Sequence, residues 1–402
     1  MNPDTGDGAL DLLARARRLP GEWLLLAPFA GRCRLAHQPF AHLELHTNGS
    51  LCLTHEGRRQ LLRGPALAWV EELSRRWESP GAGWVSHDHG AWLHGQPLPA
   101  PCENPLLRFA WYRQWQERPV AQVLLDTPST ALPDPARVFR ALWPRQRWLD
   151  AVEEVRARIR RGDVYQVNLV QPFETDWPGE PAELWRRLLR RSRPGYCAVL
   201  YSAETQLLSL SPEQFLLRRG SSLETLPIKG TVPAGPQAAQ ALLDSAKDRA
   251  ELAMIVDLLR NDLSRVCRAG SVATGPFPEL LELPTVVHSQ TRVRGELLPG
   301  KGLQDCFEAL FPCGSIVGCP RSSALECLRE LEGAGRGLAM GAIGLVEPDG
   351  DFSFSVAIRT ARLEAGRLCL KAGGGITWAS DPMAEYLECL TKVAAFAAAW
   401  AD

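Results

Sequence analysis

Three glutamates have a spacing that could bind a divalent cation. Glu385 and Glu388 are three residues apart in an expected helix over 382–400, so they share one face of that helix. Glu251 lies in a second expected helix, within DRAELAMIVDLLRND. Carboxylates on a half-buried face repel one another unless a cation joins them, and hard oxygen ligands suit Mg²⁺. The alternative is that these are solvated glutamates paired with neighbours such as Lys392.

A lysine beside a Gly-Thr turn is a candidate nucleophile. Lys229 is followed by Gly230 and Thr231 in the sequence PIKGT, ahead of an expected helix. A lysine that faces the protein interior loses proton affinity and can attack carbon as a neutral amine. A solvated lysine is the ordinary alternative.

Other residues could bind a carboxylate group. The glycines Gly373, Gly374 and Gly375 follow an expected strand, and glycines allow backbone N–H groups to approach an anion, although such runs also form simple turns. Arg359 alternates with apolar residues in VAIRTA and is expected on a strand. There it either binds a carboxylate through two hydrogen bonds or pairs with a structural acid. The same two interpretations apply to the polar side chains His288 and Arg321.

The elements that must position these residues predict an α+β fold. Long antiparallel sheets covered by helices fit the irregular alternation of elements better than βαβ units. The Pro-rich segment 126–144 is interpreted as a connector, and HLELHT and GSLCLTHE before it are typical of hairpin strands. Helices are expected over 148–161, 238–263, 302–310, 322–332 and 382–400, and strands over 164–169, 207–210, 215–217, 352–357 and 368–371.

Composition excludes several classes of function. Lys plus Arg number 45 and Asp plus Glu 46 in 402 residues, so no global field favours nucleic acid or an anionic membrane. The N-terminus lacks the basic and apolar regions of a signal peptide, and the apolar run 23–30 is too short to span a bilayer. The eleven cysteines include no CxxC pair and are interpreted as reduced thiols. We therefore expect a cytoplasmic protein that binds neither nucleic acid nor membrane.

Two further groups of possible metal ligands are given ordinary interpretations. His87, Asp88 and His89 lie among Gly, Ser and Trp, so a solvated loop is favoured over a metal site. Cys313 and Cys319 have no histidine close in sequence, so a zinc site is not expected.

Nine segments together resemble the motifs of the chorismate-utilising enzymes. That family contains the large subunits of anthranilate and aminodeoxychorismate synthases and the isochorismate and salicylate synthases. The resemblance implies a large antiparallel β-sandwich flanked by helices, in which an N-terminal region (1–145) packs on a chorismate-binding catalytic region (146–402). The segments follow in family order: GDVYQVNL, LSPEQFL, PIKGT, AELAMIVDLLRNDL, VVHSQTRVRGEL, FPCGSIVGCPRSSALE, VAIRTA, AGGGITWAS and AEYLECLTKV.

The resemblance also implies a role for each matching residue. Glu251 and Glu388 match the Mg²⁺ ligands of the family, with Glu385 beside them. Glu213, in LSPEQFL, matches the general acid, whose pKa must be raised to keep it protonated. His288 is expected to orient the substrate or to buffer the departing charges. The positions expected to hold chorismate are Gly230, Thr231, Arg321, Arg359, Gly373, Gly374, Gly375 and Gln166.

Two positions separate the branches of the family. At Gln166, the water-using members carry a lysine base, and glutamine cannot deprotonate water, so an ammonia-using branch is favoured. At Lys229, the anthranilate synthases usually have alanine, whereas the aminodeoxychorismate synthases have lysine. The resemblance therefore implies that Lys229 forms an adduct at C2 of chorismate and that ammonia is added at C4.

Departures from the family pattern keep other interpretations open. Val232, Pro233 and Ala234 replace an expected Arg-rich continuation, Arg321 replaces a lysine, and Ala339 stands where relatives place an aromatic residue. The N-terminal third has no clear match to the segment through which relatives bind tryptophan. Anthranilate synthesis and non-catalytic chorismate binding thus remain alternatives. Because the chain has no glutaminase motif, the resemblance implies a separate glutamine amidotransferase subunit.

Overall fold

The computed structural model describes residues 16, 21–29, 32–119, 138–191, 195–202, 206–282, 286–397 and 400. Most of the predicted connector, residues 126–137, lies outside the described residues, as does the polar N-terminal segment 1–15. In the described ranges, no helix is both long enough and apolar enough to cross a membrane.

The N-terminal region is mainly antiparallel sheet. Strand β2 is long enough to pair with three neighbours, β1, β3 and β6. The two segments predicted to form hairpin strands lie in β2 and β3, which confirms that prediction. The elements are β1 (Trp23–Phe29), β2 (Arg32–Leu45), β3 (Leu51–His55), β4 (Arg58–Leu62), α2 (Ala66–Arg76), β5 (Gly81–Val85), α3 (His89–Leu93) and β6 (Leu107–Pro119).

The remaining chain adds strands to the same sheet and covers it with helices. Strand β1 pairs with β9, and β5 pairs with β19, so the two parts of the chain share one sheet. The boundary between them near residue 145 stays a prediction. The elements up to the small second sheet are β7 (Arg140–Ala141), α5 (Arg145–Arg161), β8 (Gln166–Asp176), α6 (Pro181–Arg191), β9 (Tyr196–Tyr201), β10 (Gln206–Ser211), β11 (Gln214–Arg219), β12 (Ser222–Leu226), β13 (Ile228–Pro233), α7 (Ala238–Asp244), α8 (Ala246–Ser264), β14 (Ala273–Thr274), β15 (Glu279–Glu282) and β16 (Val286–Gln290).

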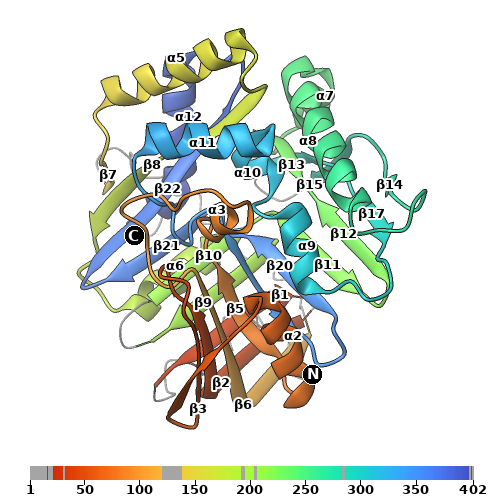
Figure 1. Cartoon of the computed structure of the whole chain (residues 1–402). Coiled ribbons are helices and arrows are strands. Elements are labelled where there is room, and N and C mark those ends of the chain that lie inside the picture. The colour runs from red at the N-terminus through yellow and green to blue at the C-terminus, as the bar shows by residue number, and fades with distance from the viewer. Residues whose placement is uncertain are drawn as a thin grey trace, which may run out of the picture.

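The last third of the chain completes both the sheet and its helical cover. Strand β22 pairs with β8 along ten consecutive residue pairs, and α12 packs on β22. Figure 1 shows α5, α11 and α12 gathered above β8 and β22. The elements are β17 (Val293–Glu296), α9 (Leu303–Leu310), α10 (Gly314–Val317), β18 (Gly318–Cys319), α11 (Arg321–Glu332), β19 (Ala342–Val346), β20 (Phe352–Val356), β21 (Thr360–Glu364), β22 (Arg367–Ile376) and α12 (Pro382–Ala397).

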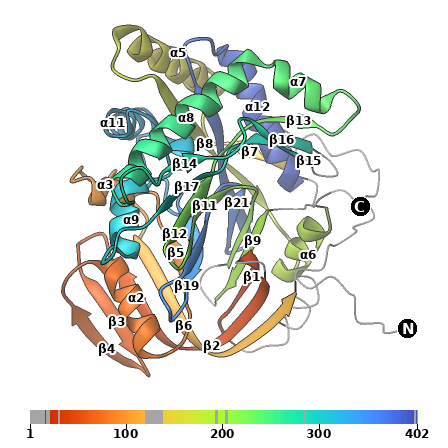
Figure 2. The same ribbon diagram turned by 90° about the vertical axis from the view of Figure 1, so that its right-hand side faces the viewer.

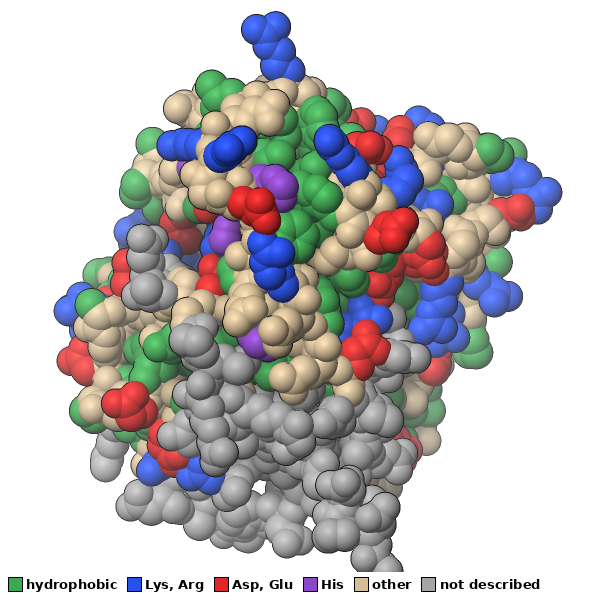
Figure 3. Space-filling view, turned by 90° about the horizontal axis from the view of Figure 1, so that it is seen from below, with side chains coloured by type: hydrophobic (Ala, Val, Ile, Leu, Met, Phe, Trp, Pro, Cys, Tyr) green, Lys and Arg blue, Asp and Glu red, His purple; other side chains and the backbone are tan. Residues whose placement is uncertain are grey.

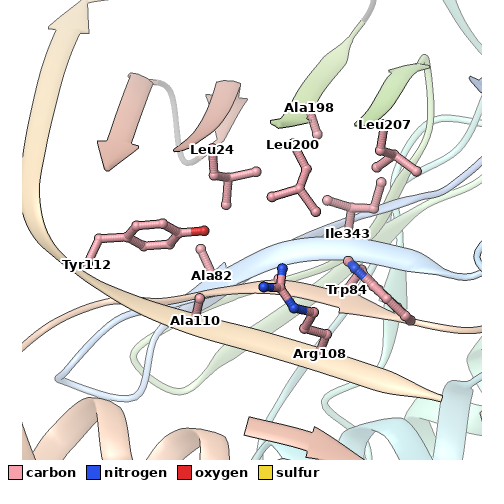
Figure 4. Close-up of a pocket in the computed structure, with 11 residues that line it drawn as sticks. Leu24, Ala82, Trp84, Arg108, Ala110, Tyr112, Ala198, Leu200, Leu207 and Ile343 are labelled. Atoms are coloured by element: carbon pink, nitrogen blue, oxygen red, sulfur yellow. The ribbon is translucent and has the colours of Figure 1, made fainter. Parts of the chain in front are cut away.

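Two layers of sheet pack face to face, as predicted for an α+β sandwich. Along β1, Trp23 and Leu25 point into the main core, whereas Leu24 and Leu26 point into a second apolar cluster. Figure 4 shows this second cluster between strands β1, β9 and β10 on one side and β5, β6 and β19 on the other. Because β1 is buried on both faces, its sequence is continuously apolar. All strand pairings of the described residues are antiparallel.

A separate three-stranded sheet, in the order β13-β16-β15, carries several of the predicted site residues. Helices α7 and α8 pack against β13 of this small sheet (Figure 2). The sequence predicted one helix over 238–263, which is wrong at one point. Ser245 is extended (ψ 98°) and its hydroxyl accepts a hydrogen bond from the Asp248 N–H at 3.2 Å, so α8 has its own N-cap.

Two local predictions are corrected by the structure. His87, Asp88 and His89 are not a solvated loop: all three are buried, and Asp88 accepts backbone hydrogen bonds from Arg336 and Gly337 at 3.0 and 2.8 Å. Arg359 is not on a strand but in the bend between β20 and β21, with a φ of 48°. Its neighbours in VAIRTA therefore do not alternate with it on a sheet face.

The other predicted elements are present, but β8 and β22 continue to residues 176 and 376, so Gly373, Gly374 and Gly375 lie within β22 and do not follow a strand. Helix α5 ends at Gly162, whose φ of 83° gives the left-handed C-cap that a glycine allows. On the described part of the face seen from below, acidic and basic side chains lie interspersed (Figure 3), as expected for a chain with nearly balanced charge.

Candidate active site

The small sheet places Lys229, Thr231 and His288 together. Thr231 on β13 is the register partner of His288 on β16, and the Thr231 Oγ1 lies 2.7 Å from the His288 Nδ1. The Nε2 atom of His288 is buried and has no hydrogen-bond partner among the described residues. Burial, with a smaller effect from Arg359, lowers the pKa of His288 to about 4. The ring is therefore neutral at physiological pH and can hydrogen-bond a ligand through Nε2.

Gly230 allows the backbone of β13 to pass close to helix α8. Its φ is 79°, and a Cβ atom there would lie 3.0 Å from the Cβ of Asp248. The glycine thus has a structural reason in addition to its predicted proximity to a ligand.

Glu213 and Lys229 are linked through one serine. The Ser315 hydroxyl donates to the Glu213 Oε1 at 2.6 Å, and the Lys229 Nζ donates to the backbone oxygen of Ser315 at 3.1 Å. Glu213 is 3% exposed, and burial raises its pKa to about 7, although Ser315, Lys229 and the Ile228 backbone act in the opposite direction. The predicted rise in the pKa of this carboxyl is confirmed. Glu213 can hold a proton at neutral pH and give it up to a leaving group.

Gln166 lies beside Lys229 and against β22, the strand that contains Gly373, Gly374 and Gly375 and is called the glycine strand below. Its side chain is fully buried, yet neither its Oε1 nor its Nε2 has a hydrogen-bond partner among the described residues. A Cβ atom on Gly375 would lie 2.1 Å from the Gln166 Nε2 and 3.6 Å from the Lys229 Nζ. A buried amide with both polar atoms unpaired is costly, so a polar ligand at this point would restore its hydrogen bonds.

Arg359 also has an unpaired polar group. The guanidinium is largely buried and makes no hydrogen bond or ion pair with the described residues, and burial lowers its pKa. An arginine stays protonated even then, so the group is a buried positive charge without a counter-ion. An anionic ligand would supply that counter-ion.

The three predicted carboxylates meet between α8 and α12, with two lysines among them. Lys247 on α8 lies 3.4 Å from the Glu385 Oε1 and 4.0 Å from the Glu251 Oε1. Lys392 on α12 lies 2.7 Å from the Glu388 Oε1 and donates to the backbone oxygen of Gly373 at 2.7 Å. The sequence left open that these glutamates pair with neighbouring lysines, and the structure does contain such pairs.

The electrostatics of these carboxylates differ. Burial raises the pKa of Glu251, and its Oε1 is buried without a hydrogen-bond partner in the described residues. Burial acts the same way on Glu388, but Lys392, Lys247 and Lys229 outweigh it, so its pKa is lowered. A Cβ atom on Gly374 would lie 3.1 Å from the Glu385 Oε2 and 3.5 Å from the Glu388 Oε1. Only the absence of a side chain on Gly374 leaves these oxygens accessible from the strand.

Comparison with protein families gives one match over most of the chain. Residues 24–398 match the family of chorismate binding enzymes. The chain belongs to this chorismate-binding enzyme family. The match spans both the strands of the N-terminal region and the residues of the candidate site.

Curated relatives of this chorismate-binding enzyme have two different names. Aminodeoxychorismate synthase component 1 of Klebsiella aerogenes is 37% identical over 297 residues, which are 72% of this chain and 64% of the relative. The Escherichia coli K12 protein of the same name is 38% identical over 62% of this chain and 56% of its own length. Anthranilate synthase component 1 1 of Haloarcula marismortui is 38% identical over 63% of this chain and 53% of its own length. The chain matches about half to two thirds of the length of these relatives.

Solved structures share the fold. Anthranilate synthase component I from Streptococcus pneumoniae superimposes with a TM-score of 0.77 at 24% identity, covering 94% of this chain and 93% of that one. The menaquinone-specific isochorismate synthase of Escherichia coli gives a TM-score of 0.68 at 18% identity, covering 97% and 98%. The α+β fold predicted from the sequence is confirmed.

The carboxylates suit Mg²⁺ in chemistry but are not arranged around a single point. Glu251, Glu385 and Glu388 supply hard oxygen atoms, and the Glu251 Oε1 has no hydrogen-bond partner in the described residues, although the Lys247 ammonium lies 4.0 Å away. Nevertheless, no group of three His, Cys, Asp or Glu side chains in the described ranges has the arrangement of a metal site. The three carboxylates thus supply suitable oxygen atoms, but they would have to draw together around an ion, and the ammonium groups of Lys247 and Lys392 now lie beside them.

Arg321 does not fit its predicted substrate-binding role. Its guanidinium forms a two-pronged ion pair with buried Asp262, and its Nε donates to the backbone oxygen of Pro312 at 3.1 Å. It also donates to the carbonyl groups of Ala309 and Leu310 at 3.1 and 3.2 Å, at the end of α9. With its donors directed at protein atoms, Arg321 is a structural residue of this chorismate-binding enzyme.

Two residues that shape the site, Ser315 and Lys247, were not predicted from the sequence. Ser315 lies within the FPCGSIVGCPRSSALE motif, and Lys247 lies four residues before Glu251. Both positions could have indicated from the sequence that these residues lie near the site. The cavity of Figure 4, about 10 Å³ in volume, is lined by none of the candidate site residues. That volume holds about one water molecule, so the cavity is too small for an amino-acid effector as it stands.

Proposed function

We propose that this chain converts chorismate and ammonia to 4-amino-4-deoxychorismate, the reaction of an aminodeoxychorismate synthase component 1. The observation that carries the proposal is the connection of Lys229 to Glu213 through Ser315. A candidate amine nucleophile and a carboxylic acid that stays protonated near neutral pH lie on either side of one serine. Displacement of a hydroxyl group needs both.

In the proposed mechanism, the two groups act on opposite ends of an allylic system. The neutral Lys229 amine forms a bond to C2 of chorismate, the ring double bond shifts, and the C4 hydroxyl leaves as water with the proton of Glu213. Ammonia then forms a bond to C4, the double bond shifts back, and Lys229 is released. The proton lost from the new C4 ammonium group restores the acid form of Glu213. Each step conserves electrons, so no redox cofactor is needed.

The unpaired groups around these two residues match a dianionic substrate. Arg359 would neutralise one carboxylate of chorismate, and the N–H groups of the glycine strand would bind beside it. Gln166 and the His288 Nε2 would hydrogen-bond the polar groups of the ring. Glu251, Glu385 and Glu388 would hold Mg²⁺, which supplies charge neutralisation to a substrate carboxylate when bound.

The decisive experiment identifies the product from chorismate, Mg²⁺ and ammonium salt. We expect 4-amino-4-deoxychorismate from the wild type and loss of most of it in Lys229→Ala, whereas Lys301→Ala, a lysine variant away from the site, should behave as wild type. In the absence of ammonia, the intact mass of the chain should increase by a chorismate-derived group. Peptide mapping should place that group on the peptide that contains Lys229. An alanine variant with full output would refute the covalent role of Lys229.

Anthranilate synthesis is the second candidate, because the Haloarcula marismortui anthranilate synthase component is as similar to this chain as the aminodeoxychorismate synthase components are. Anthranilate as the main product would establish it. The absence of any product would favour a non-catalytic chorismate-binding protein.

The proposed reaction implies partners of known chemistry. A separate glutamine amidotransferase would supply ammonia, and a lyase would release pyruvate from the product to form p-aminobenzoate for folate synthesis. We propose these partners from the names of the relatives, which describe a first component of a synthase.

A further inference from the structure

Lys247 occupies an unfavourable place in its own helix. It is the second residue of α8 (Ala246–Ser264), where the positive end of the helix dipole disfavours a cation. It also precedes Glu251 by four residues, which is the less favourable order for an acid–base pair on a helix. The local helix therefore gives no reason for a lysine here, so the reason is to be sought across the site.

Across the site, Lys247 faces a carboxylate from a different element. The Glu385 side chain on α12 is 4% exposed, and its Oε1 accepts from the Lys247 Nζ at 3.4 Å and from the Ser380 hydroxyl at 2.7 Å. The second carboxylate near the same ammonium is Glu251, at 4.0 Å. The ammonium thus lies between two largely buried carboxylates that would otherwise repel each other.

Lys392 is held differently. Its ammonium pairs with Glu388 and also donates to the backbone oxygen of Gly373, which fixes its position on the strand. Within the described residues, no backbone carbonyl accepts from Lys247, and its side chain is about half exposed (49%). Of the two lysines, Lys247 is the one that can turn towards solvent without breaking a hydrogen bond to the main chain.

We propose that the Lys247 ammonium is an internal counter-cation, which lies between Glu251 and Glu385 until a divalent cation displaces it, and thereby weakens metal binding. The inference rests on the proposed Mg²⁺ site. A single charge of +1 stabilises the two carboxylates in the absence of metal, and a charge of +2 replaces it when metal binds. The lysine links α8 to α12 in the metal-free protein and lowers the affinity of the site for the metal.

The test is calorimetric titration of the purified full chain with MgCl₂ alone, in the absence of chorismate. Lys247→Met should bind Mg²⁺ roughly three- to tenfold more tightly than wild type, because the competing positive charge is removed. The gain is no larger because solvent already screens part of that charge in the wild type. Lys247→Arg retains the charge and should keep an affinity close to that of the wild type. Lys301→Met is the matched control, since it removes a lysine paired at 2.6 Å with Asp305, four residues on.

A second readout is the melting temperature in excess chelator. Lys247→Met should melt below the wild type, and added MgCl₂ should raise its melting temperature more than that of the wild type. If Lys247→Met does not fold, Lys247→Gln is measured in its place. If the wild type binds Mg²⁺ and the neutral variants bind it no more tightly, the role of Lys247 is refuted but the proposed metal site is not. Failure of the wild type to bind Mg²⁺ would overturn the proposed metal site together with the role of Lys247.

Discussion

The pKa of Glu213 is set first by burial and next by the hydroxyl group of Ser315. Burial raises the pKa of this carboxyl to about 7, and the hydrogen bond from Ser315 opposes that rise because it stabilises the ionised form. As a general acid, Glu213 is active while protonated, so its contribution is present below about pH 7 and is lost above it. Rates calculated on the concentration of neutral ammonia should therefore fall about tenfold per pH unit above pH 7.

Replacement of Ser315 tests this assignment. In Ser315→Ala the ionised form of Glu213 loses a hydrogen bond, so its pKa rises and the falling limb of the pH profile should move to higher pH. The change should be about one pH unit, given the usual strength of a hydrogen bond to a charged group. A purely structural role for Ser315 would lower the rate at every pH and leave the midpoint unchanged. The measurement is kcat/KM for neutral ammonia from pH 6 to 9.

At the scale of single residues, the sequence predicted types of chemistry better than their partners. The acid Glu213 and the lysine Lys229 were predicted as site residues, because each lies in a family motif that aligns with only one stretch of this sequence. The contacts of Arg321 were not predicted, because its partner Asp262 is 59 residues away and no local pattern reveals that pair. Buried ion pairs between distant segments are decided by packing, which the sequence of either segment alone does not show.

Strand β22 has no free space for a side chain at Gly373 or Gly375. A Cβ atom on Gly373 would lie 1.8 Å from the backbone oxygen of Leu169, whereas on Gly375 it would meet the end of the Gln166 side chain at 2.1 Å. Gly373→Ala must shift the β8–β22 pairing and should lower the free energy of unfolding by about 1–3 kcal/mol. Gly375→Ala displaces a movable side chain, so it should mainly impair chorismate turnover.

The control for the glycine variants is Gly235→Ala, because no atom lies within 4 Å of the added Cβ. Urea unfolding and steady-state kinetics on the same samples separate the two effects. If Gly375→Ala keeps full activity, Gln166 and the strand do not border the substrate.

Helix α9 is anchored at its C-terminus by the guanidinium of Arg321. Arg321→Met leaves buried Asp262 without its counter-ion and the last carbonyl groups of α9 without their donors. Removal of one partner of a buried ion pair costs about 3–5 kcal/mol, so the melting temperature should fall steeply. Arg260→Met, which removes an exposed partner of Asp257 on α8, should change stability by less than about 1 kcal/mol.

The KM for chorismate distinguishes the structural role of Arg321 from the substrate-binding role that the sequence suggested. At a temperature where Arg321→Met is folded, its KM should equal that of wild type. A large increase in KM with unchanged stability would restore the sequence-based assignment.

Most elements could be predicted from the sequence because their signals are local. The apolar spacing of α5 predicted that a helix forms there, and Gly162 predicted where it ends. The break at Ser245 was missed because residues 238–263 are compatible with one continuous helix, and only the N-cap formed by Ser245 divides them. The pairing of β13 with β16, which brings Thr231 to His288, joins segments about 57 residues apart and has no local signal.

In the whole molecule, the N-terminal strands are part of the scaffold that supports the site. β5 pairs with β19, which pairs with β20, and β20 pairs with β11 just after Glu213. The backbone around the acid is therefore connected by hydrogen bonds to strands from the first quarter of the chain. The N-terminal strands thus support the backbone at Glu213 through the shared sheet.

The source of nitrogen is a property of the chain as a whole. Attack at C4 needs neutral NH₃, which is about one per cent of total ammonium at neutral pH, taking a pKa near that of simple amines. Below about pH 7 Glu213 stays protonated, so the rate per total ammonium should rise about tenfold per pH unit with the fraction of NH₃. Above pH 7 the loss of the Glu213 proton cancels that rise, so the rate should reach a plateau and not increase further.

The proposed amidotransferase partner changes this profile, because it would deliver ammonia directly to the site. With the cognate partner and glutamine, the supply of NH₃ no longer depends on bulk pH, and only the falling limb from Glu213 should remain above about pH 7. The purified chain is assayed with ammonium salt and with glutamine, with and without the partner. Glutamine alone should give no product, since the proposed reaction of this chain consumes ammonia and includes no amide hydrolysis. Substantial glutamine-dependent synthesis by the isolated chain would show that it contains a glutaminase site of its own.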